Sequence, residues 1–160
     1  MIVAKENTLS NVGGVVGTAY DSTINACCFE GKIQSSGTVG GIVGRFSGNA
    51  KDCLNSGIIK GLDPIDASVG GIFGEITPGL GGTTIESCRN KGEIRACGYC
   101  SLGGIVGFVT VQRASELVNH EWVYTPGRCS IIDCVNEGKV TGEECDSSAS
   151  IGGIIGQLFS

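Results

Sequence analysis

The chain has few of the residues on which several common functions depend. Its 160 residues include one His, one Trp, one Met and three Pro, and its 11 Lys and Arg are outnumbered by 16 Asp and Glu. A net charge of -5 with no basic cluster excludes electrostatic binding to nucleic acid or to an anionic membrane. No apolar run approaches the roughly 20 residues of a membrane-spanning helix, so we predict no membrane insertion by this segment.

The scarcity of His also excludes a zincin-type metal site. His120 lies in the stretch VNHEWVY, which superficially resembles the start of such a motif. The motif needs a second His, and the chain has none. We therefore predict no catalytic metal and no cofactor.

Glycine and β-branched residues are abundant instead, and they recur as a hexapeptide. The sequence VGGIVG at residues 39–44 has near copies at 12–17, 69–74, 102–107 and 151–156. A phosphate-binding loop would precede a helix and usually end in Lys or Ser/Thr. The five residues that follow the copies share no chemistry: Thr18, Arg45, Glu75, Phe108 and Gln157. We therefore interpret the glycines as positions of close backbone packing or strand bending.

A second element recurs between the hexapeptides. It reads apolar-x-x-Cys-x-Asn-x-Gly-x-apolar at 24–33, 50–59, 85–94 and 131–140, with Phe29 in place of Asn in the first copy. The hexapeptides begin 27, 30, 33 and 49 residues apart. We interpret residues 1–160 as a single repeat domain with units at about 12–38, 39–68, 69–101 and 102–150, and a partial unit at 151–160.

The repeats predict an all-β fold of the parallel β-solenoid class, because no helical periodicity accompanies the Val, Ile and Gly content. We expect prism-like coils of about three short strands, four coils in all and part of a fifth. The first strand covers the hexapeptide and two further residues, the second ends at the Cys, and the third follows the Asn-x-Gly turn. Four residues of the third strand are expected to point inward: Ile33, Ile59, Ile94 and Val140.

In-register stacking would turn each repeated residue into a column. One predicted column contains Cys27, Cys53, Cys88 and Cys134, and another contains Asn55, Asn90 and Asn136. Cys is among the residues most often buried. Neighbouring coils hold Cβ atoms slightly farther apart than a disulfide prefers, so we expect the Cys column to carry thiols.

The hexapeptide, the polar turn after it and the Asn/Gly strand end resemble the GLUG-motif repeat family, over nearly the whole chain. This family occurs in secreted and surface proteins of bacteria, including adhesins and non-catalytic parts of IgA-specific metallopeptidases. The resemblance implies a stalk, spacer or binding module, located outside the cell or on its surface, and it implies no catalytic residue. The recurring Cys departs from the commoner family pattern.

The remaining cysteines, of nine in total, lie in or beside loops. Cys97, Cys100 and Cys145 follow equivalent turns of neighbouring units, so a disulfide between Cys145 and one of the other two is one interpretation. A zinc site that uses these thiols is another, although a lone C-x-x-C is a weak signal. A redox-active C-x-x-C needs a helix N-terminus, which the sequence does not indicate.

The fourth unit carries an insertion between Phe108 and Cys129. It contains His120, Trp122 and Tyr124, and long loops on regular scaffolds often bind partners through such aromatic residues. Phe108, His120, Trp122 and Tyr124 are therefore the candidate binding residues. The alternative interpretation is a short helix or hairpin that packs Trp122 on the flank of the domain.

The functional hypothesis is a non-enzymatic extracellular repeat segment of a larger bacterial protein, acting as a spacer or adhesive module. Its expected partners are a host protein or glycan, the rest of the parent polypeptide, and a second copy bound end to end. One alternative is a carbohydrate-active β-helix enzyme, a glycosidase or lyase, which would need paired carboxylates. Asp52 and Asp133 occupy equivalent positions, but Ala26 and Ser87 fill the others. The second alternative is a metal-binding protein that uses the loop cysteines.

Overall fold

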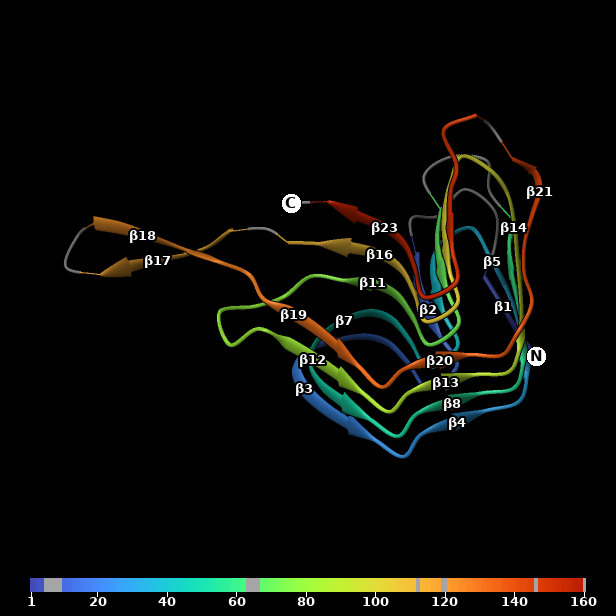
Figure 1. Ribbon diagram of the computed structural model, residues 1–160, viewed down its shortest axis with the longest axis horizontal. Helices are drawn as coiled ribbons and strands as arrows, with labels where there is room; N and C mark the ends of the chain where they lie inside the picture. Colours follow the sequence, from blue (N-terminus) through green and yellow to red (C-terminus); the bar gives the residue numbers. More distant parts are fainter. Residues whose placement is uncertain (5–9, 63–66, 112, 119–120, 146, 160) are drawn as a thin grey trace.

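The computed structural model describes residues 1–4, 10–62, 67–111, 113–118, 121–145 and 147–159, with the backbone alone for 113–118 and 122–126. All regular structure in these residues is β-strand, so the predicted all-β class is confirmed. The described part of the chain has no helix that is long and apolar enough to cross a membrane. Most of the strands belong to four parallel sheets, which we name A to D (Figure 1).

Each sheet receives strands from successive repeat units, in chain order across sheets A, B and D. Sheet A contains β1 (Ile2–Val3), β5 (Lys32–Ser35), β9 (Ile58–Gly61), β14 (Glu93–Gly98) and β21 (Val140–Cys145). Sheet B contains β2 (Ser10–Gly13), β6 (Gly37–Gly40), β10 (Ala67–Gly70), β15 (Cys100–Gly103) and β22 (Ser150–Gly152). Sheet D contains β4 (Cys28–Phe29), β8 (Leu54–Asn55), β13 (Arg89–Asn90) and β20 (Val135–Asn136).

Sheet C is curled, because its long strands bend back toward sheet D (Figure 1). It contains β3 (Val16–Asn25), β7 (Val43–Lys51), β11 (Phe73–Ile76), β12 (Thr83–Glu86), β16 (Val106–Thr110), β19 (Cys129–Ile132) and β23 (Ile155–Phe159). β7 pairs with β11 through its first half and with β12 through its second half. The two separate strands β11 and β12 of the third unit therefore occupy the positions that the single long strand β7 occupies in the second unit.

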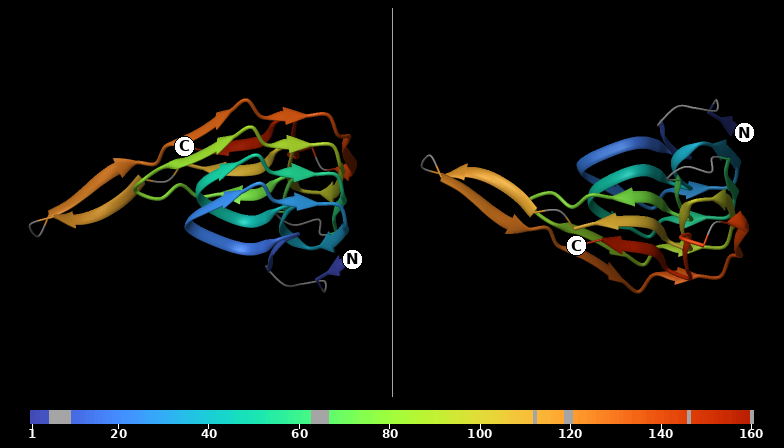
Figure 2. Two further views of the ribbon diagram at one scale, coloured as in Figure 1. Left: turned by 90° about the horizontal axis from the view of Figure 1, so that it is seen from below. Right: turned by 90° about the horizontal axis from the view of Figure 1, so that it is seen from above.

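The repeat units lie in register. Val39 is paired with Val12 on one side and Val69 on the other, and Val69 is paired in turn with Leu102. Figure 2 shows the resulting stack, from the blue N-terminal unit to the red C-terminal strands. Equivalent residues of the hexapeptides therefore lie side by side across the whole stack.

Each hexapeptide bends in its middle and is divided between two sheets. β6 ends at Gly40 in sheet B and β7 begins at Val43 in sheet C. A Cβ on Gly40 would overlap the carbonyl oxygen of Val43, so the bend is possible only with glycine at this position. The expected first strand, which covers the hexapeptide and two further residues, is thus divided in two at glycines that were expected to pack closely or bend the strand. The second unit contains four strands where three were expected.

The bend divides the interior into two apolar clusters. The larger cluster lies inside curled sheet C, where the rings of Phe46 and Phe73 stack with centroids 4.9 Å apart. The smaller cluster lies between sheets A and B. Ile33, Ile59 and Ile94 of sheet A are fully buried in this smaller cluster, and Val140 packs against it.

The insertion of the fourth unit forms an antiparallel hairpin of β17 (Arg113–Val118) and β18 (Glu121–Pro126). The hairpin projects sideways from the stacked sheets in all three views (Figures 1 and 2). The backbone therefore follows the hairpin alternative and not the helix alternative.

Candidate binding groove

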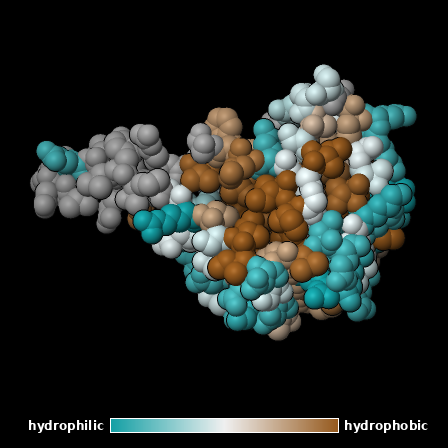
Figure 3. Space-filling view, viewed as in Figure 1, coloured by the Kyte–Doolittle hydropathy of each residue, from teal (hydrophilic) through white to brown (hydrophobic). Residues whose placement is uncertain are grey.

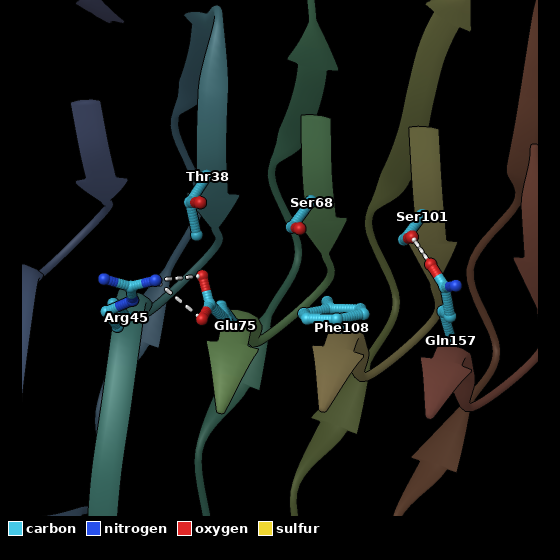
Figure 4. Close-up of a pocket in the computed structure, with 7 residues that line it drawn as sticks. All are labelled: Thr38, Arg45, Ser68, Glu75, Ser101, Phe108 and Gln157. Atoms are coloured by element: carbon cyan, nitrogen blue, oxygen red, sulfur yellow. Dashed lines mark hydrogen bonds and ion pairs between the residues drawn. The ribbon is translucent and has the colours of Figure 1, made fainter. Parts of the chain in front are cut away.

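The bend of each hexapeptide creates a groove on the outside of the molecule, in the angle between sheets B and C. The residue before each hexapeptide faces the residue after it across this angle. The groove encloses about 300 Å³ and crosses several units (Figure 4). Its lining residues are Thr38, Ser68 and Ser101 on the sheet B wall, and Arg45, Glu75, Phe108 and Gln157 on the sheet C wall.

The last glycine of each hexapeptide keeps the floor of the groove open. A Cβ on Gly74 would lie 2.8 Å from the methyl carbon of Thr38 and 2.8 Å from the carbonyl carbon of Val39. Any larger residue would therefore push into the neighbouring unit and fill the angle between the sheets. The space above the floor is left to the side chains of the two walls.

An ion pair occupies one end of the sheet C wall. Arg45 Nη2 donates to both carboxylate oxygens of Glu75, at 2.7 and 2.8 Å, and Thr77 Oγ1 donates to Oε1 at 3.1 Å. The hydrogen bond to Glu75 raises the pKa of the Arg45 guanidinium. The Arg45 side chain is 37% exposed and the Glu75 side chain 11%, so the guanidinium is the more accessible member of the pair. The pair carries no net charge.

An aromatic ring and two polar side chains occupy the other end. Phe108 is partly buried and is paired with Glu75 of the preceding unit and Gln157 of the following one. Ser101 Oγ donates to Gln157 Oε1 at 2.7 Å across the groove. Figure 4 shows the Phe108 ring almost edge-on, so that one ring face is turned toward the side of Ser68 and Ser101.

The Asn column supports the bend from inside. Asn55 Nδ2 donates to Asn90 Oδ1 at 2.7 Å, and Asn90 Nδ2 donates to Asn136 Oδ1 at 2.8 Å. Each Asn Oδ1 also accepts the backbone N–H two residues on, as in an Asx turn. A Cβ on Gly71 would lie 2.6 Å from Asn90 Cγ. The second glycine of the hexapeptide therefore packs directly against the Asn of the Asn-x-Gly element.

The Cys column lies at the turn between sheets C and D. Cys53 and Cys88 are buried, whereas Cys27 and Cys134 at its two ends are partly buried, and all four hold thiols. Hydrogen bonds with Cys134 and Cys53, together with burial, raise the pKa of the central Cys88 thiol. Because its pKa is raised, Cys88 stays protonated at neutral pH. Outside the column, burial raises the pKa of the Cys129 thiol to about 11.

The structure separates the two disulfide candidates of the C-x-x-C stretch. Cys100 is buried, and its Sγ lies 3.7 Å from Sγ of Cys145. Cys97 is partly buried and is paired in sheet A with Glu143. Among the residues that the structure describes, no three His, Cys, Asp or Glu side chains are grouped to hold a metal ion.

The structure places the described parts of the candidate binding residues in two different regions. Phe108 lies in the groove, and the backbone of Trp122 and Tyr124 belongs to projecting strand β18, where they pair with Leu117 and Ser115. His120 and the side chains of Trp122 and Tyr124 lie outside the described residues.

Six groove residues were missed by sequence reasoning: Thr38, Arg45, Ser68, Glu75, Ser101 and Gln157. The signal was present at the two positions that flank each hexapeptide. The preceding position is always small and polar, and the following position varies in charge and size.

Comparisons with protein-family models, curated proteins and solved structures found no match to this chain.

Proposed function

We propose that the chain is a parallel β-solenoid that acts as a non-enzymatic, extracellular binding and spacer module, with the groove as its binding surface. The solenoid interpretation is supported by the strand order, because each full unit passes through sheets B, C, D and A in the same sequence. Repetition of one such unit is the defining property of solenoid proteins.

The observation that carries the proposal is the contrast between the interior and the groove. Positions that build the coil repeat from unit to unit, such as the hexapeptide glycines and the Asn column. The groove position after the hexapeptide changes from Arg45 to Glu75 to Phe108. Such variation on a constant scaffold is typical of a surface adapted to a ligand.

The carboxylates favour a binding role over a hydrolytic one. Among the described residues that line the groove, Glu75 is the one carboxylate, and Arg45 binds both of its oxygens. A glycosidase of the usual kind needs a second acid across the substrate. Asp52 and Asp133 lie in turns at φ angles of 54° and 50°, a position that Ala26 and Ser87 share in other units. That position therefore has a backbone role.

The extracellular or cell-surface location and the role as part of a larger bacterial protein are also part of the proposal. They are supported by the five hexapeptides and their resemblance to the GLUG-motif repeats. The in-register stacking of the units is suited to a spacer, because each added unit lengthens the stack.

The experiment measures binding and turnover together. The purified chain is immobilised and exposed to a panel of polysaccharides and host-surface glycoproteins, and released reducing or unsaturated ends are measured in parallel. We expect saturable binding with no released ends. Ser68→Tyr, which fills the groove, should abolish binding, whereas Ser130→Tyr on an exposed position of β19 should leave it intact. Time-dependent release of ends, or equal binding by both variants, would contradict the proposal.

A further inference from the structure

We propose that the groove takes a neutral oligosaccharide chain that lies across several units, with the face of Phe108 as its stacking platform. The inference deepens the proposed function and rests on it, because it names the ligand class of the same groove.

Recognition along most of the groove must use side chains, because six of the seven lining residues lie on strands whose backbone is hydrogen-bonded on both sides. The exception is Gln157, which lies on terminal strand β23. β6, β10 and β15 each have a parallel neighbour on both sides, as do β7, β11 and β16. A peptide that adds as an extra strand needs a free sheet edge, which these six strands do not offer. An extended peptide is therefore a poor match for this site.

The side chains of the walls match the chemistry of a sugar. The hydroxyls of Ser68 and Ser101 each donate and accept, the Gln157 carboxamide does both, and the Arg45 and Glu75 pair supplies donors beside an acceptor. A sugar hydroxyl also donates and accepts, so it can bind at each of these groups. The spacing of the units, about 4.8 Å between strands, is close to the length of one sugar unit, so successive sugars can meet successive units.

The Phe108 ring gives this groove an apolar surface that a purely polar groove would lack. Phe108 is a large apolar side chain that stays partly exposed between the polar residues Glu75 and Gln157. Ligand sites commonly combine an apolar platform with a few polar groups that fix orientation. The C–H face of a pyranose ring is apolar, and it can pack on the Phe108 face while the hydroxyls at the ring edge reach the walls.

The charge of the groove favours a neutral ligand over a charged one. Arg45 and Glu75 are the charged residues among the described residues that line it, and their charges cancel in an ion pair of 2.7 Å. An acidic polysaccharide would have to break this pair or approach the Glu75 carboxylate. We therefore expect selectivity for uncharged sugar chains.

The test titrates the chain with neutral gluco-, manno- and xylo-oligosaccharides of five or six sugars, by calorimetry and by NMR shifts of groove residues. We expect one of these series to bind, with shifts at Phe108, Ser101 and Gln157 and little dependence on added salt. Phe108→Ala should weaken binding by roughly tenfold or more. The matched control is Tyr99→Ala, which removes an aromatic ring that is 38% exposed and lies outside the groove lining.

The outcomes separate this inference from the proposed function. Unchanged affinity in Phe108→Ala, with the thermal unfolding midpoint also unchanged, would overturn the stacking role. Salt-sensitive binding to acidic polysaccharides or proteins that depends on Arg45 would overturn the neutral-sugar inference and leave the binding module intact. Cleavage of a bound oligosaccharide would retain the ligand class and overturn the non-enzymatic function.

Discussion

Single residues show why the two repeated sequence elements occur together. The second glycine of the hexapeptide packs against the Asn of the later element: Gly41 against Asn55 and Gly71 against Asn90. In the first unit Gly14 packs against the ring of Phe29, which stands where the other units have Asn. The space for a side chain at this glycine is therefore already filled from inside.

Because of this contact, adding one methyl group at the second glycine of a hexapeptide should strongly destabilise the fold. In Gly71→Ala the new Cβ would lie 2.6 Å from Asn90 Cγ and would also overlap the carbonyl oxygen of Gly104. We expect a loss of about 3 kcal/mol or more in the free energy of unfolding, measured by chemical denaturation. Gly81→Ala is the control, because a Cβ there has no neighbour within 4 Å in the part of the chain that the structure describes. Equal stability of the two variants would contradict the packing argument.

A second prediction concerns Cys100 and Cys145, whose sulfur atoms lie 3.7 Å apart. With glutathione disulfide as oxidant, the two thiols should lose their hydrogens and form a disulfide, and two molecules of glutathione should be released. The bond would close a loop of 45 residues and add about 2 to 4 kcal/mol of stability. Peptide mapping by mass spectrometry should find the bond in Cys97→Ser and not in Cys145→Ser. Mapping that instead joins Cys97 to Cys145 would refute it.

The Asn column shows how an element can be buried and polar at once. Asn90 is fully buried, accepts from Asn55 Nδ2 and Gly92 N, and donates to Asn136 Oδ1 and Gly92 O. Every hydrogen-bonding group of this amide therefore has a partner. A fully satisfied buried network stabilises one register of the strands, because a shifted strand would leave these groups unpaired.

Asn90→Asp tests the column through its pH dependence. A carboxylate cannot donate to Asn136 Oδ1 or Gly92 O, whereas a protonated carboxyl can donate to one of them. The folded-state pKa of this Asp should therefore be raised above its ordinary value of about 3.9. A raised folded pKa gives stability that is present below the unfolded pKa and lost as the pH rises.

The measurement is the difference in unfolding free energy between Asn90→Asp and the unchanged chain, across pH. We expect a loss of about 3 kcal/mol at neutral pH and a smaller loss near pH 4. Asn49→Asp, at an exposed position of β7, should change stability little at either pH. A loss that is independent of pH would mean that the carboxylate is solvated.

The strands were predictable where the sequence pattern is compatible with a single local structure. Alternation around Ile33, Ile59 and Ile94 predicts strands with these residues inward, and they are fully buried in sheet A. The hexapeptide is compatible with two backbone conformations, because Val-Gly-Gly-Ile-Val-Gly can form a straight strand or bend at its glycines. The bend depends on contacts with Asn residues far along the chain, which local propensity does not contain.

At the scale of the whole molecule, the two ends of the stack expose strands that are paired on one side. The terminal strands are β1, β2, β3 and β4 at one end and β19, β20, β21, β22 and β23 at the other. Figure 3 looks onto the C-terminal end and shows a broad apolar area there. Five residues of the last units are exposed: Ile132, Val135, Ile151, Leu158 and Phe159. Open edges with apolar side chains favour association.

We therefore expect the isolated chain to associate end to end at high concentration, as measured by sedimentation velocity. Leu158→Lys should weaken this association, because the Leu158 side chain, 62% exposed, lies on terminal strand β23. The same exposure predicts little change in monomer stability. Lys32→Leu, on internal strand β5, is the control that should not reduce association. A chain that stays monomeric at every concentration would contradict this expectation.

The groove could not be predicted from sequence, although its residues flank the motif that identified the repeat. Arg45, Glu75 and Phe108 share no chemistry and so appear unrelated along the chain. They become a site only when in-register pairing brings them side by side and the bend opposes them to Thr38, Ser68 and Ser101. Of the candidate binding residues named from the sequence, Phe108 lies in the groove, whereas the hairpin of the insertion projects away from the stack.

A crystal structure of this chain should show each repeat unit as one coil, stacked in register on the next. We predict that Val39, Val69 and Leu102 will occupy neighbouring parallel strands, about 4.8 Å apart, with Asn55, Asn90 and Asn136 joined through their side-chain amides. A sandwich of antiparallel strands, or hexapeptides that do not lie side by side, would rule out this stacked arrangement.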